Sequence, residues 1–250
     1  MKKNFFKIVT PLYNAEDWIS LTIKTVLSQD YDNFEWVIID DMSTDNSVNI
    51  IKDMTSHDSR VKLIENKEKK FALKNIHEGT EHGKPKKNDV IVILDGDDWF
   101  PNPRVLTYLN EVYQDKDTWM TYGNHLNWPD IENEPFPIFG YPSEVVENNK
   151  YRNFRYLASH LRTYKYGLWK KVNKEQFLDE NGEYWQTCAD IATMLPLCEL
   201  AGPRAKFLSK ALYVYNNVNP LNDYKVYTGL QKQEETKIRN KKPHDRLEKL

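Results

Sequence analysis

The chain has 250 residues, 40% of them hydrophobic and 29% charged, with a formal net charge of -2. This composition is that of a folded globular protein, and the near-neutral charge gives no general attraction to nucleic acid. Its two cysteines are too few for a disulfide scaffold, and no apolar run reaches the roughly 20 residues of a transmembrane helix. We therefore expect a cytoplasmic protein without nucleic-acid partners or a transmembrane segment. Peripheral contact with a membrane stays open.

The first hundred residues alternate between apolar runs and helical spacings. A run of branched aliphatic residues predicts a strand, and apolar residues three or four apart predict a helix. The predicted strands are 5–9, 34–39, 61–65 and 90–94, and the helices between them are 18–29, 48–54 and 71–80. This order predicts an α/β fold with a Rossmann-like, mostly parallel sheet flanked by helices.

The pattern loosens after residue 100. Residues 128–151 hold four prolines and little periodicity, so we expect an irregular surface segment there. The last stretch, 227–250, is charged and helix-prone. The other predicted elements are a helix over 103–112, a strand over 119–122, a helix over 187–201 that Pro196 kinks, and one or two strands within 205–215.

Acidic side chains follow the fourth predicted strand directly. Asp95, Asp97 and Asp98 are closely spaced, and Gly96 lets the backbone approach a ligand. Carboxylates this close repel one another unless water or a cation separates them, and Mn²⁺ and Mg²⁺ prefer oxygen ligands. A solvated turn that caps the next helix is the alternative, but the buried strand in front favours a metal site.

Two earlier strands also end in polar clusters, at 10–14 and at 40–45. In a parallel sheet these clusters share an edge with 95–98, where open α/β sheets bind ligands. Tyr13 can stack on a nucleobase, and the carboxylates of Asp40 and Asp41 can accept hydrogen bonds from the base or the ribose. The third cluster can hold a metal on a diphosphate, so together the clusters predict a nucleotide site.

The three segments resemble, in this order, those of the family 2 glycosyltransferases, which are inverting enzymes with the GT-A fold. The TxxYN, DDxSxDxS and DxDD segments of that family stand here at 10–14, 40–47 and 95–98. The resemblance covers residues 5–125 well and is patchy from there to 220. It implies a single catalytic domain over 1–220, with a nucleotide-sugar-binding half at 1–125, an acceptor half at 126–220 and a charged helical extension at 221–250.

The resemblance also implies a nucleotide-diphosphate-sugar donor, most commonly a UDP-sugar, and Mn²⁺ or Mg²⁺ as cofactor. The acceptor would be a glycan, lipid-linked or protein hydroxyl, and without a QxxRW motif the transfer of one sugar is expected. Lys74 stands in a segment where the family usually reads ARN. Asp97 and Asp98 would ligate the metal, and the nucleotide-binding residues would be Thr10, Pro11, Tyr13, Asn14, Asp41, Lys74, Asp95, Gly96 and Asp97.

The catalytic base of the family is usually an acid in a Glu-Asp pair on a later helix. Here the pair reads Ala189-Asp190, so Asp190 is the expected general base and the first acid is missing. His160 and Arg162 alternate with Leu161, as on an extended strand, and are candidates on the acceptor side. A metal-binding histidine found in some members has no clear match at 216–219.

Two other functions stay open at this point. A non-catalytic nucleotide-sugar or carbohydrate-binding module is compatible with the missing acid before Asp190. A phosphatase of the haloacid dehalogenase type would use Asp95 as nucleophile. That motif normally has Thr or Val where Asp98 stands and lies on the first strand, which disfavours it.

Overall fold

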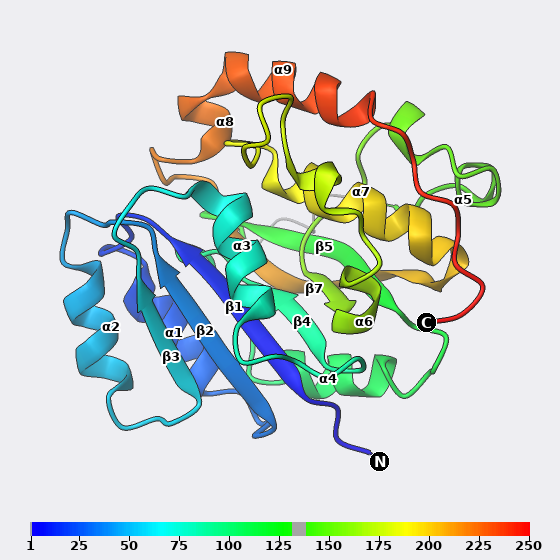
Figure 1. Ribbon diagram of the computed structural model, residues 1–250. Coiled ribbons are helices and arrows are strands. Elements are labelled where there is room, and N and C mark those ends of the chain that lie inside the picture. The colour runs from blue at the N-terminus through cyan, green and yellow to red at the C-terminus, as the bar shows by residue number, and fades with distance from the viewer. Residues whose placement is uncertain (1, 132–138) are drawn as a thin grey trace.

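The computed structural model of the chain describes residues 2–131 and 139–250. Within these ranges the strands form one seven-stranded sheet, in the order β3-β2-β1-β4-β6-β5-β7, with helices on both faces (Figure 1). The strands are β1 (Phe6–Leu12), β2 (Phe34–Asp40), β3 (Val61–Glu65), β4 (Val90–Ile93), β5 (Met120–Trp128), β6 (Arg162–Lys165) and β7 (Ala205–Asn216). The α-helices are α1 (Ile19–Leu27), α2 (Ser47–Thr55), α3 (Phe71–Glu81), α4 (Val105–Val112), α5 (Ser143–Glu147), α6 (Tyr166–Trp169), α7 (Ala189–Ala201), α8 (Asp223–Val226) and α9 (Thr228–Arg239).

The first four strands form the predicted parallel half of the sheet. β1 pairs in parallel with both β2 and β4, and β2 pairs in parallel with β3. β5 and β7 are parallel as well, so the expectation of a mostly parallel α/β sheet is confirmed. The carboxyl ends of β1, β2 and β4 consequently meet at one edge, as the order of the elements predicts.

Strand β6 runs against its neighbours, which the sequence pattern did not predict. It pairs antiparallel with β4 and with β5. In the β4 register Ile93 lies opposite Arg162, the first residue of β6. Because the two strands point in opposite directions, the start of β6 lies beside the carboxyl end of β4.

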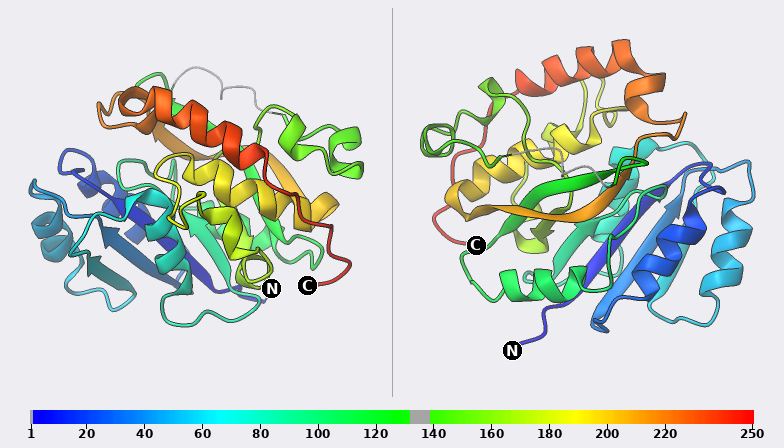
Figure 2. Two further views of the ribbon diagram at one scale, coloured as in Figure 1. Left: turned by 45° about the horizontal axis from the view of Figure 1, so that its top comes forward. Right: turned by 180° about the vertical axis from the view of Figure 1, so that it is seen from behind.

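Alternate residues of β4 face two different cores, which explains its unbroken aliphatic run. Val90 and Val92 pack with α1, α2 and α4 on one face of the sheet. Ile91 and Ile93 pack with α3, α6 and α7 on the other face. Figure 2 shows the two helical layers from opposite sides of the sheet.

Helix α3 approaches the sheet closely at Gly79. A Cβ atom placed on this residue would lie 2.5 Å from Val9 Cγ1 and 2.7 Å from Ile39 Cδ1. Both distances are shorter than ordinary van der Waals contact, so a side chain at this position would displace the helix or the strands.

Several element boundaries differ from the predictions. β5 continues to Trp128 because it pairs along its length with β7. α7 begins at Ala189, and Pro196 lies inside the continuous helix. Residues 132–138 of the predicted irregular segment lie outside the described residues. Both cysteines, Cys188 and Cys198, are buried free thiols. None of the helices in the described ranges has the length and apolar composition to cross a membrane.

The C-terminal stretch folds against α7. α9 lies above α7 on the side away from the sheet (Figure 1). Beneath it, the Arg152 guanidinium donates to the buried Glu199 of α7, with Nε 2.5 Å from Oε1 and Nη2 3.0 Å from Oε2. Arg152 Nη1 also donates to the carbonyl oxygen of Ile238 in α9 at 2.5 Å. One buried guanidinium therefore links α7 to α9.

We predict that Arg152→Met lowers the free energy of unfolding by about 3–5 kcal/mol, because it leaves the Glu199 charge buried without its partner. Urea denaturation at pH 7 measures the change. Arg155→Met, at an exposed position three residues away, is the matched control. Equal losses in the two variants would contradict the prediction.

Candidate active site

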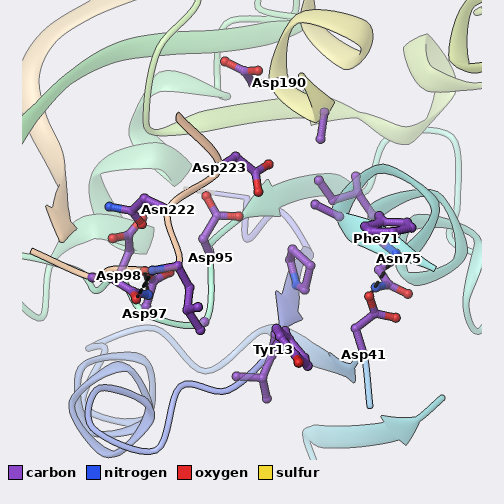
Figure 3. A pocket seen from close by; sticks show the side chains of 18 of the residues that line it. Tyr13, Asp41, Phe71, Asn75, Asp95, Asp97, Asp98, Asp190, Asn222 and Asp223 are labelled. Carbon is purple, nitrogen blue, oxygen red and sulfur yellow. Dashed lines mark hydrogen bonds between the residues drawn. The ribbon is translucent and has the colours of Figure 1, made fainter. Parts of the chain in front are cut away.

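A cavity of about 330 Å³ opens at the carboxyl ends of β1, β2 and β4, within the size range of small-molecule sites. Pro11 and Tyr13 line it from the end of β1, Asp41 from the end of β2, and the residues 95–98 from the end of β4. The opposite wall comes from later segments: the start of β6, the start of α7 and residues 219–227. Figure 3 shows this arrangement around Asp95 and Asp223.

Asp41 forms an ionised acceptor at one end of the cavity. Its Oδ1 accepts from Asn66 Nδ2 at 2.9 Å and from the Lys70 backbone N–H at 2.8 Å. Its Oδ2 accepts from the Phe71 backbone N–H at 2.9 Å. Burial opposes ionisation, but these hydrogen bonds outweigh it and lower the pKa of Asp41. The carboxylate is thus oriented by the start of α3.

Asn75 presents an unpartnered donor next to Asp41. Its side chain is 1% exposed and lines the cavity. Its Oδ1 accepts from Asn66 Nδ2 at 2.8 Å, whereas its buried Nδ2 makes no regular hydrogen bond among the described residues, although its proximity helps to lower the pKa of Asp41. A buried amide donor without a partner is costly, and a ligand carbonyl would satisfy it. Asp41 and Asn75 together offer an acceptor and a donor.

The cation at this end of the cavity is Lys69. Its Nζ lies 2.9 Å from the centroid of the Tyr13 ring and 3.5 Å from Asp41 Oδ2. Tyr13 itself is 41% exposed at the mouth of the cavity. Lys74, the cation expected from the sequence, is not among the lining residues, and its Nζ lies 3.8 Å from Glu68 Oε1.

Thr10 and Asn14 also lie away from the cavity. Thr10 is fully buried, and its Oγ1 accepts from Trp36 Nε1 at 2.8 Å within the sheet. Asn14 accepts at Oδ1 from the Thr44 backbone N–H at 2.7 Å, which ties the loops after β1 and β2 together. The nucleotide-binding roles of Thr10, Asn14 and Lys74 stay predictions. In this structure their side chains interact with Trp36, Thr44 and Glu68.

The two acceptor-side candidates, His160 and Arg162, lie together beside Asp95. Arg162 Nη2 lies 3.4 Å from Asp95 Oδ2 and 2.9 Å from His160 Nδ1. Burial lowers the pKa of His160 well below its usual value, and the charges of Arg162 and His125 lower it further. His160 is therefore neutral at pH 7, and it stacks on Tyr213 with ring centroids 4.2 Å apart. His160, Arg162 and Asp95 all line the cavity.

Asp98 connects the end of β4 to the end of β7. Its Oδ1 accepts from the Asn216 backbone N–H at 2.7 Å, and the Tyr213 hydroxyl lies 2.5 Å from its Oδ2. The side chain is 1% exposed. Burial raises the pKa of Asp98 well above its usual value, and the neighbouring Asp97 and Asp95 raise it further. Asp98 therefore anchors the turn of residues 95–98 to the end of β7.

Asp97 faces the cavity, where its Oδ2 accepts from Asn219 Nδ2 at 2.6 Å. Burial raises its pKa to about 6, and the charge of Asp95 contributes to the increase. No three His, Cys, Asp or Glu side chains among residues 2–131 and 139–250 form a metal-binding group. Mg²⁺ is commonly held by only one or two carboxylates together with substrate phosphates and water. The carboxylates of Asp95, Asp97 and Asp98 lie close enough together to raise the pKa values of Asp97 and Asp98, and a divalent cation of this kind would offset their mutual repulsion.

Asp190 lies in the first turn of α7 and lines the same cavity. Burial raises the pKa of its carboxyl group, and the Arg162 guanidinium opposes this shift. The positive end of the helix also favours the ionised form. Cys188, Tyr156, Asp95 and Asp223 are the other titratable groups that interact with it.

The sequence did not single out Asp223, the first residue of α8. In Figure 3 its carboxylate lies next to Asp95, on the side toward Asp190. Burial raises the pKa of Asp223 to about 6, and the charges of Asp95, Asp190 and Asp97 act in the same direction. No pattern in the sequence marks this residue, because it lies in a stretch that resembles a solvated extension. Asn75 could have been noticed in the ARN-like segment.

The comparisons with known proteins agree with this architecture. The model of the family described as Glycosyl transferase family 2 matches residues 7–171. An uncharacterized glycosyltransferase of Haemophilus influenzae is 36% identical over 127 residues, which are 50% of this chain and 48% of that relative. A UDP-Glc:alpha-D-GlcNAc-diphosphoundecaprenol beta-1,3-glucosyltransferase of Escherichia coli, WfgD, is 38% identical over 96 residues, or 38% of this chain and 36% of that protein. The chain thus spans half or less of the length of these two relatives.

Two solved structures share the fold. Staphylococcus aureus TarS in complex with UDP-GlcNAc has a TM-score of 0.62 at 18% identity, over 85% of this chain and 58% of that one. A mannosyltransferase of Pyrobaculum calidifontis in complex with GDP-Man and Mn²⁺ has a TM-score of 0.61 at 16% identity, over 98% and 67%. The expected GT-A architecture is confirmed by these similarities.

We predict that Asp223→Asn raises the melting temperature of the EDTA-treated protein at pH 8. Because folding raises the pKa of Asp223 to about 6, its contribution to stability is lost as the pH rises through that value. Asparagine removes this penalty, so the increase should be smaller at pH 5. Asp53→Asn, on the exposed side of α2, should show no such dependence. A lower melting temperature of Asp223→Asn at pH 8 would contradict the prediction.

Proposed function

We propose a function from the premise that this chain belongs to glycosyl transferase family 2: it moves one sugar from a nucleotide-diphosphate-sugar to an acceptor hydroxyl, with inversion. The observation that carries the proposal is the convergence on one cavity of the Tyr13–Asp41 end, the acidic turn after β4, and Asp190. Membership of this family also argues against the phosphatase considered from the sequence.

The nucleobase binds between Tyr13 and Asp41 in this proposal. Asp41 accepts from a ring N–H, and the unpartnered Nδ2 of Asn75 donates to the adjacent carbonyl oxygen. A uracil ring offers this pattern of a donor beside acceptors. The E. coli relative is named for UDP-Glc and the TarS structure contains UDP-GlcNAc, which supports a UDP-sugar as donor.

The diphosphate lies at the acidic turn, next to Asp95, Gly96 and Asp97. Gly96 packs closely against the end of β1, where a Cβ atom would lie 3.0 Å from Leu12 Cδ1 and 3.3 Å from the Pro11 carbonyl oxygen. We assign Asp97 and Asp98 to a bound Mn²⁺ or Mg²⁺, with Asp98 held in place by its bonds to β7. When bound, such a cation offsets charge on the leaving diphosphate.

Asp190 is the general base of the proposed reaction. It takes the proton of the acceptor hydroxyl as the hydroxyl oxygen attacks the anomeric carbon and the bond to the diphosphate breaks. A raised pKa suits this role, since an efficient base titrates near the working pH. The Arg162 guanidinium favours the ionised form of the Asp190 carboxyl group, and neutral His160 contacts the acceptor beside it.

A lipid-linked acceptor fits the mouth of the cavity best. Leu221, Tyr224 and Val226 line it and are 42%, 41% and 48% exposed. This apolar rim supports peripheral contact with a membrane surface. The name of the E. coli relative, which specifies a diphosphoundecaprenol acceptor, supports the same class.

The metal assignment predicts that turnover requires a divalent cation. Release of nucleoside diphosphate from UDP-glucose, UDP-N-acetylglucosamine or GDP-mannose should occur with Mn²⁺ and stop with excess EDTA. Asp97→Asn should lower the rate in Mn²⁺, whereas Asp53→Asn should not. Equal rates with Mn²⁺ and EDTA would contradict the assignment. Donor binding without any turnover would support a binding module instead.

The base assignment predicts that Asp190→Asn lowers the turnover rate by about 10²–10⁴-fold, while donor affinity changes only a few-fold. The wild-type rate should fall as the pH drops through the raised pKa of Asp190, at a higher pH than for an ordinary aspartate. Rate against pH and calorimetric donor titration measure both effects. Near-normal turnover of Asp190→Asn would assign the base elsewhere, first to His160.

A further inference from the structure

Glu234 of α9 holds the turn that precedes Asp190. Its Oε2 accepts from the Thr187 backbone N–H at 2.8 Å and from Thr187 Oγ1 at 2.6 Å. Its Oε1 accepts from the Gln186 backbone N–H at 3.2 Å. The Glu234 side chain is 8% exposed and Thr187 is 1% exposed, so these bonds lie out of water. Charge-assisted hydrogen bonds of this kind are stronger than those between neutral groups.

The turn held by Glu234 has an unfavourable backbone conformation. Cys188, which directly precedes α7, has φ 53° and ψ 31°, in the left-handed region. A non-glycine residue persists there only when its surroundings determine the backbone on both sides. The Cys188 thiol donates to the backbone carbonyl oxygen of Gln231 at 3.2 Å, one helical turn before Glu234. α9 therefore determines this turn at two points.

α9 is itself fixed to the rest of the protein. Ile238 is 1% exposed in the core, and its carbonyl oxygen accepts from the buried Arg152. Arg239 Nη1 donates to the carbonyl oxygen of Phe154 at 2.8 Å. Because α9 is anchored in this way, its contacts hold the 186–188 turn in one position relative to the core.

We propose that Glu234 is a positioning residue for catalysis: it fixes the 186–188 turn so that Asp190 points at the reacting hydroxyl. The inference rests on the proposed function, because it takes Asp190 as the base. Misplacing a catalytic group by about 1 Å can lower a rate by roughly 10²-fold. The stretch 221–250, expected from the sequence as an extension, thus contributes to the active site.

The experiment compares Glu234→Ala with Glu235→Ala. Glu235 is the next residue of the same helix; it accepts from Arg239 Nε at 2.7 Å and makes no hydrogen bond to the 186–188 turn among the described residues. The measured quantities are kcat for nucleoside-diphosphate release with Mn²⁺, donor affinity by calorimetry, and the melting temperature. The donor is whichever of UDP-glucose, UDP-N-acetylglucosamine and GDP-mannose turns over fastest with the wild-type protein.

We expect Glu234→Ala to lower kcat by about 10- to 100-fold with donor affinity changed only a few-fold. Glu235→Ala should leave both unchanged. Glu234→Gln keeps an acceptor oxygen for Thr187 and should retain more activity than Glu234→Ala. In the Asp190→Asn background, Glu234→Ala should lower the residual kcat no further, because its effect passes through Asp190.

Each of the following results would overturn the inference, and together they separate it from the proposed function. Equal kcat for Glu234→Ala and Glu235→Ala, with Asp190→Asn inactive, would reject the positioning role alone. If Glu234→Ala lowers kcat as much in the Asp190→Asn background as in the wild-type protein, its effect does not pass through Asp190. Near-normal turnover of Asp190→Asn would reject the base and the inference together. If Glu234→Ala does not fold, Thr187→Val removes one of the three bonds, and an unchanged kcat would overturn the inference.

Discussion

Arg162 is the cation around which the carboxylates of the cavity are arranged. Its guanidinium lies 3.4 Å from Asp95, and its charge opposes the effect of burial on the pKa of Asp190. This position depends on topology, because β6 runs against β4 and Arg162 pairs with Ile93 at the end of β4. In a parallel β6 the same residue would lie at the other edge of the sheet. The acidic cluster would then lack this neighbour, and the repulsion among its members would raise the cost of ionising each one.

The part of the cavity at the ends of β1, β2 and β4 could be predicted because it depends on local patterns. An aliphatic run followed by polar residues indicates a buried strand and its end, and parallel strands bring such ends together. Pro11, Tyr13, Asp41 and Asp97 all line the cavity for this reason. Asp190 also lies there, although the family resemblance and not the helical pattern pointed to it.

The remainder of the site depends on contacts between distant segments, which no local pattern records. Lys69 and not Lys74 lies beside Tyr13, because Lys74 lies on a side of α3 that does not line the cavity, where its Nζ is 3.8 Å from Glu68 Oε1. The antiparallel direction of β6 follows from its pairing with β4 and β5, which periodicity cannot indicate. Glu234 and Asp223 belong to charged stretches whose composition equals that of a solvated surface, yet Glu234 is buried against the 186–188 turn.

The close approach of α3 to the sheet at Gly79 has a consequence for the Tyr13–Asp41 end of the cavity, where we propose that the nucleobase binds. Asn75 lies one helical turn before Gly79, and Phe71 lies one turn before Asn75 on the same rigid element. The thickness of the layer between helix and strands therefore determines how far Asn75 stands from the acceptor Asp41. A methyl group at Gly79 would push α3 away from the sheet and widen the space between Asn75 and Asp41. Selectivity between pyrimidine bases, which have one ring, and purine bases, which have two, would then depend on a residue that no ligand touches.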